Sequence, residues 1–85
     1  MISTVRELAA EAIFVSDLQP SECPTSKTVE DTVTKMILRY GTDGCAAGVA
    51  EEFGDHPEIA VRRMVWVCAE LESVLARQRR PHYAS

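Results

Sequence analysis

The stretch DHPEIAVRRMVWVCAELESVLARQ, residues 55–78, decides the fold because it combines a helix start with a long apolar stripe. Asp55 is suited to cap the first turn, Pro57 stands where a missing N–H costs nothing, and Glu58 would complete a capping box. Apolar residues then recur at helical spacing: Val61, Met64, Cys68, Leu71 and Leu75, with Ala60, Val67 and Val74 widening the stripe. We therefore expect a helix over residues 55–78, roughly 36 Å long, with Leu71 central to the core.

Three shorter helices are expected before it, over residues 4–16, 26–40 and 44–53. The first would begin at Thr4 with a Thr-x-x-Glu capping box, and the second would stop at Gly41. The small-sided segment GCAAG in the third predicts the close approach of another helix. With few alternating β-branched runs, the sequence predicts an all-α domain of four helices, in which the long C-terminal helix packs on three shorter ones.

Residues 17–25 hold two prolines and several small polar residues, which predicts a stiff loop. Two interpretations of this loop remain open. It is either a surface connector or a rigid strap whose Leu18 packs onto the bundle.

The chain has 85 residues, which is the size of one small domain, so we expect a single domain over residues 1–85. Its net charge is −4. The charge is uneven: residues 1–60 hold eleven acidic and four basic side chains, whereas residues 61–85 hold five arginines and two glutamates. A basic C-terminal tail over residues 79–85 would suit an acidic partner or nucleic acid. The simpler interpretation is that cations stabilise the C-terminal end of a helix.

Three widely spaced cysteines, Cys23, Cys45 and Cys68, make a poor disulfide framework and fit a reducing compartment. The N-terminal segment carries charges inside its apolar run, so it does not resemble a signal peptide. No uncharged run approaches the roughly 20 residues of a membrane span. We therefore expect a cytoplasmic protein that does not act at a membrane.

The stretch GVAEEFGDHPEIAVRRM resembles the helix-turn-helix of transcription regulators, with Ala50, Gly54 and Ala60 near the motif's small and apolar positions. Arg63 stands where such regulators usually carry an apolar residue. The resemblance implies DNA binding, and its candidate contacts are Arg62, Arg63, Arg77, Arg79 and Arg80. The acidic residues around the expected turn disfavour duplex DNA, because binding depends on neutralising phosphates.

The stretches SDLQPS, GCAAGVAEEFGDHPE and RRMVW also resemble short actinomycete proteins of uncharacterised function. That resemblance implies a stand-alone small protein and brings no activity with it.

Catalytic and metal sites have little support. Spacing permits a nucleophile pair of His56 with Cys45 or Cys68, but no third group that would orient it is evident, and His82 lies in the tail. The cysteines also lack the short ligand pairs of a zinc site. We therefore expect no enzymatic activity, no catalytic or metal-binding residues and no cofactor.

The function expected from the sequence is a non-catalytic helical protein–protein interaction module that forms a homodimer; the alternative is a helix-turn-helix DNA-binding regulator. A second stripe on the long helix would form the interface: Ile59, Arg63, Trp66, Glu70, Ser73 and Arg77. Trp66 would be its exposed anchor, unless the first helix or the proline loop wraps round and buries it.

Overall fold

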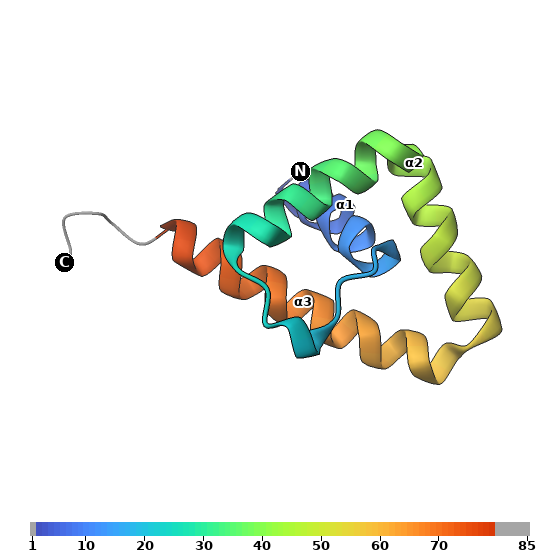
Figure 1. Cartoon of the computed structure of the whole chain (residues 1–85). Helices are drawn as coiled ribbons and strands as arrows, with labels where there is room; N and C mark the ends of the chain where they lie inside the picture. Colours follow the sequence, from blue (N-terminus) through green and yellow to red (C-terminus); the bar gives the residue numbers. More distant parts are fainter. Residues whose placement is uncertain (1, 80–85) are drawn as a thin grey trace.

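A computed structural model describes residues 2–79, which fold into three α-helices and one short 3₁₀ helix (Figure 1). The helices are α1 (Ile2–Val15), η1 (Pro20–Glu22), α2 (Ser26–Asp55) and α3 (Pro57–Arg79). No strand occurs within residues 2–79. The all-α class is therefore confirmed, while the predicted basic tail beyond residue 79 lies outside the described residues.

The expected count of four helices is not confirmed, because the segments predicted as helices over residues 26–40 and 44–53 form one helix, α2. The Thr25 side chain caps its start by accepting a hydrogen bond from the Thr28 N–H at 3.2 Å. Gly41, expected to end a helix, instead kinks α2 with φ 74° and ψ 167°. Such a backbone conformation is almost restricted to glycine. Gly41 therefore divides α2 into two arms, residues 26–40 and 42–55.

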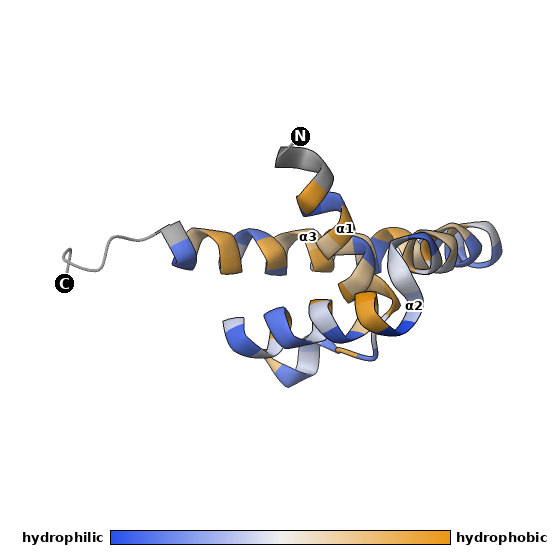
Figure 2. Cartoon of the chain, turned by 90° about the horizontal axis from the view of Figure 1, so that it is seen from above, coloured by the Kyte–Doolittle hydropathy of each residue, from blue (hydrophilic) through white to orange (hydrophobic). Residues whose placement is uncertain are grey.

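The two arms of α2 and the N-terminal part of α3 trace three sides of a triangle, and α1 passes into it (Figure 1). Viewed from above, α1 rises out of the plane of the other helices towards its N-terminal half (Figure 2), where Val5, Arg6 and Glu7 are exposed. The C-terminal half of α1 is the buried half, with Ile13 and Phe14 almost fully covered. The frame therefore encloses the C-terminal half of α1 and leaves residues 5–7 exposed.

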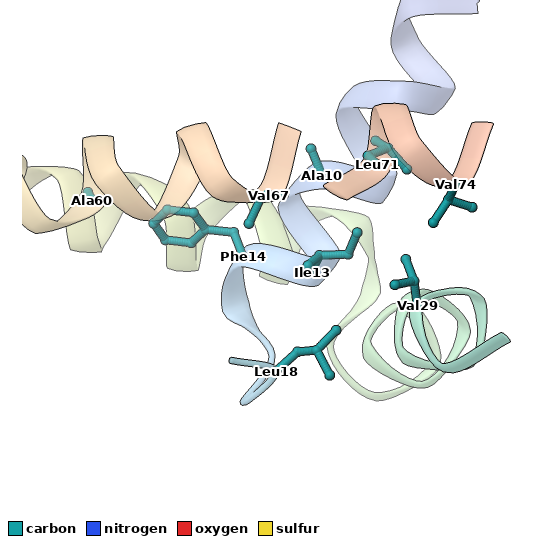
Figure 3. Packing of buried hydrophobic residues seen from close by; sticks show 9 residues of the cluster. All are labelled: Ala10, Ile13, Phe14, Leu18, Val29, Ala60, Val67, Leu71 and Val74. Atoms are coloured by element: carbon teal, nitrogen blue, oxygen red, sulfur yellow. The ribbon is translucent and has the colours of Figure 1, made fainter. Parts of the chain in front are cut away.

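The main core lies where α1 meets α3 and the first arm of α2 (Figure 3). Its buried members are Ala10, Ile13, Phe14, Leu18, Val29, Ala60, Val67, Leu71 and Val74. Leu71 is 6% exposed, which confirms its predicted place in the core. Leu18 is also buried, so the proline-containing loop is a strap packed on the bundle rather than a surface connector.

A smaller cluster of buried residues joins α1 to both arms of α2 through Ala12, Met36 and Cys45. Beside it the predicted close approach of two helices occurs at Gly48. A Cβ built on Gly48 would lie 2.8 Å from Cγ1 of Val15 in α1. The Phe14 and Phe53 rings also stack across this junction, with centroids 5.8 Å apart.

Two predicted helix starts are wrong. The first helix begins at Ile2, so Thr4 lies inside α1 rather than capping it. Asp55 is the last residue of α2 and does not begin α3. His56 alone separates α2 from α3, and its carbonyl accepts the first helical hydrogen bond of α3 from the Ala60 N–H at 2.9 Å.

The predicted orientation of the long helix is also wrong in part. Ala60, Val67, Leu71 and Val74 are buried, but Val61 and Cys68 face solvent. At about 100° per residue, the buried side of α3 is turned by roughly 40° from the predicted stripe. This rotation brings Arg63 and Trp66 to the border of the core.

Candidate functional site

The outward side of α3 is the candidate functional site, because it exposes apolar side chains on a regular helix. Val61 is 51% exposed and Val65 is 64% exposed, and they lie one turn apart. Single exposed apolar residues are common on protein surfaces, whereas contiguous apolar patches are a feature of surfaces that bind partners. The large exposed apolar residues elsewhere, Leu38 for example, lie on other helices or at the start of α3.

A shallow hollow of about 370 Å³ opens beside these valines, where α2 ends and α3 begins. It is lined by Phe53, Val61, Met64, Val65 and Cys68. Its lining is almost wholly apolar, so it can hold an apolar side chain and offers little to orient a polar ligand.

Some of the predicted interface residues pack or bond within the monomer, and others are exposed. Arg63 and Trp66 are half-buried, and Trp66 packs against the main core instead of standing out as an exposed anchor. Ile59, Ser73 and Arg77 are exposed, and Glu70 is half-buried. The Arg77 Nε donates to the Ser26 hydroxyl at 2.6 Å, which ties the end of α3 to the start of α2. The predicted stripe therefore exists in part, with its central positions already in intramolecular contacts.

The Arg63 side chain caps the C-terminal end of α1 by hydrogen bonds. Its Nε donates to the carbonyl of Phe14 at 2.8 Å, and one Nη donates to the carbonyls of Ile13 and Ser16 at 3.1 and 2.9 Å. The last carbonyls of a helix lack their usual helical partners, and a fork of N–H donors from another helix can satisfy them. The Ile13 carbonyl also accepts from the Ser16 N–H at 3.1 Å and from the Ser16 hydroxyl at 2.6 Å. The guanidinium also lies over the Phe14 and Trp66 rings, 5.8 and 5.5 Å from their centroids.

The electrostatics of Arg63 follow from this position. Burial lowers the pKa of its guanidinium from the ordinary value, and the nearby Asp17 carboxylate acts in the opposite direction. No local signal predicts this role, because the carbonyls that Arg63 binds are 47 to 50 residues away along the chain. Arg63 is a structural residue that joins α1 to α3.

A second hollow, of about 360 Å³, lies inside the triangle between α1, the second arm of α2 and the start of α3. Its lining includes Phe14, Val15, Gly48, Ile59 and two charged residues, Glu52 and Arg63. The Arg63 donors are directed to the end of α1, so this hollow does not hold a free guanidinium for an anion.

The corner between α2 and α3 differs from a regular helix-turn-helix. Only His56 separates the two helices, whereas that motif uses a turn of three to four residues. Of the predicted DNA contacts, Arg62 is exposed, Arg63 holds α1 and Arg77 bonds Ser26. Arg80 and the Arg79 side chain lie outside the described residues. The geometry therefore does not assemble a basic recognition surface within residues 2–79.

The cysteines lie apart from one another, with Cys23 and Cys68 exposed and Cys45 buried. Burial raises the pKa of the Cys45 thiol, and Glu11 raises it further. A nucleophilic cysteine needs a lowered pKa and access to solvent, so Cys45 has the opposite properties. Within residues 2–79, no group of three His, Cys, Asp or Glu residues is placed to hold a metal ion.

None of the helices described over residues 2–79 combines the length and apolar character needed to cross a membrane. Comparison with known proteins adds no relative: no protein-family model, curated protein or solved structure matches this chain.

Proposed function

We propose that the chain is a non-catalytic helical interaction module that associates with a second copy of itself. The observation that carries the proposal is the pair of exposed valines on α3, Val61 and Val65. They lie on the side of α3 that turns away from the core, next to the apolar hollow at Phe53 and Met64. Covering an apolar helix face of this kind with another apolar surface lowers the free energy, because it removes apolar area from water.

The proposed surface lies beside the one expected from the sequence. Arg63 and Trp66 hold the fold together, so using them as interface anchors would require breaking contacts within the monomer. Val61 and Val65 carry no such cost. The proposal therefore places the contact on the outward side of α3 rather than on the stripe centred on Trp66.

Multi-angle light scattering across a concentration series tests the proposal. We expect the mass to rise from that of the monomer towards twice that value. A lysine at Val65 should keep the protein monomeric, because a desolvated charge at an apolar contact is costly. Leu38→Lys is the matched control, since Leu38 is 80% exposed and belongs to α2 rather than α3.

A wild-type protein that stays monomeric at the highest concentration would contradict self-association. Equal loss of association in both lysine variants would show that α3 is not the specific surface. Circular dichroism must show unchanged helicity in both variants, because both positions are exposed and their substitution should leave the fold intact.

A further inference from the structure

One line of residues along the outward side of α3 has the spacing of a coiled-coil seam. This line, the outer stripe, consists of Glu58, Arg62, Val65, Ala69, Glu72 and Ala76. All six side chains are exposed. The intervals between them alternate between four and three residues, as in the a and d positions of a heptad repeat. At about 100° per residue, the outer stripe lies opposite the buried residues of the same helix.

The outer stripe is symmetric about Val67. Val65 and Ala69 lie two residues on either side of Val67, Arg62 and Glu72 five residues, and Glu58 and Ala76 nine residues. In an antiparallel pair of identical helices related by a two-fold axis, positions equidistant from the axis face each other. An axis at the level of Val67 therefore places Arg62 of one copy opposite Glu72 of the other, and it does so twice.

From this symmetry we infer that two copies of the chain pair through their outer stripes, with α3 antiparallel to α3 and the two-fold axis passing at the level of Val67. The inference rests on the proposed function and specifies its surface and geometry. Val65 of each copy packs against Ala69 of the other at the centre, and the two Arg62–Glu72 ion pairs lie outside this apolar centre.

Charge selects the antiparallel arrangement. A parallel in-register pair would set Arg62 against Arg62 and Glu72 against Glu72, and like charges facing each other disfavour a complex. The antiparallel pair sets opposite charges together at both places. The small side chain of Ala69 opposite Val65 also permits the two helices to approach closely.

Glu72 already contacts Arg6 of α1 within the monomer. An ionised carboxylate offers two acceptor oxygens, so Glu72 can bind Arg6 and the second copy's Arg62 together. The contact with Arg6 also restricts the Glu72 side chain before association, which reduces the entropy lost on binding. A contact made by one helix from each copy is smaller than a standard interface, so the dimer should be reversible and depend on concentration.

A charge-reversal cycle tests the pairing by sedimentation equilibrium with the full chain. We expect Arg62→Glu and Glu72→Arg each to weaken dimerisation by about tenfold or more, because like charges then face each other. The double variant, R62E/E72R, should return the dissociation constant to within about threefold of wild type, since opposite charges face each other again.

Two controls separate this pairing from general effects of charge. Arg39→Glu and Asp43→Arg make the same charge changes at exposed positions on α2 and should leave dimerisation unchanged. Arg6→Gln removes the intramolecular partner of Glu72 and should weaken the dimer less than Glu72→Arg does. Thermal melts of every variant establish that the fold is retained.

The outcomes distinguish the pairing from the proposed function. If the protein dimerises but neither single reversal weakens it, or the double variant fails to restore it, the antiparallel pairing is wrong while self-association stands. If the wild-type protein is monomeric throughout, both proposals fail.

Discussion

The guanidinium group of Arg63 both caps and covers Phe14: its Nε donates to the Phe14 carbonyl at 2.8 Å, and its carbon lies 5.8 Å from the centre of the Phe14 ring. One side chain of α3 thus satisfies the polar end of α1 and packs on its largest buried residue. The stability of the whole fold should depend on this contact.

Replacing Arg63 should therefore destabilise the protein. Arg63→Met keeps much of the side-chain packing but leaves the carbonyls of Ile13, Phe14 and Ser16 without these donors. Hydrogen bonds to charged groups contribute about 1.5–3 kcal/mol each when measured by substitution, and we expect a loss of at least that size in chemical denaturation. Arg63→Lys should recover only part of it, because an ammonium group cannot form the planar fork. Wild-type stability in Arg63→Met would show that the cap is dispensable.

Leu71 and Val61 provide a test of how α3 is turned. Leu71→Ala should cost about 2–5 kcal/mol, because Leu71 is buried in the main core. Val61→Ala on the same helix should change stability by about 0.5 kcal/mol or less, as exposed positions do. Thermal melts of the two variants measure the difference. Similar losses in both would place Val61 in the core and contradict the observed orientation.

The glycines of α2 should respond differently to alanine. At Gly41 an alanine must adopt a positive φ, which costs about 1–3 kcal/mol. At Gly48 a methyl group would meet Val15 of α1 at 2.8 Å, so the two helices must move apart. Gly54 is the control, because a methyl group there would meet open space. Gly54→Ala should therefore be neutral or slightly stabilising. A destabilised Gly54→Ala variant would contradict this account.

Cys45 should make stability fall at alkaline pH. Its folded-state pKa is raised by burial, so the unfolded chain loses the thiol proton first. The corresponding stability is complete below the ordinary thiol pKa of about 8.5 and is lost as pH rises through the folded pKa. Denaturant titrations from about pH 7 to about pH 10 should show a steeper decline for wild type than for Cys45→Ala. Cys68→Ala removes an exposed thiol and should keep the wild-type slope.

Some features of the helices were predictable because they follow from local signals. The start of α2 after Thr25, the break at Gly41 and the burial of Leu71 all depend on residues near in sequence. The direct continuation of the helix after Gly41 was not predictable. A glycine with positive φ ends one helix in many proteins, and here the chain resumes helical geometry at once because the second arm packs against α1 through Cys45 and Gly48.

The orientation of α3 was only partly predictable because the helix carries apolar residues around much of its circumference. Val61 and Val65 lie on the outward side, while Val67 and Val74 lie in the core, so periodicity alone leaves the centre of the stripe poorly defined. Arg63 also made the predicted orientation of α3 less accurate. A charged residue usually marks the solvent side, whereas this one borders the core because it meets the end of α1.

The enclosure of α1 by α3 has a consequence for how the chain is made. Residues 2–15 emerge from the ribosome well before α3, yet Arg63, Val67 and Leu71 are needed to cover them. Contacts between segments far apart in sequence form late and slow folding. During synthesis the apolar side of α1 therefore waits without its final partner, and it is exposed to aggregation or to chaperones until α3 has been translated.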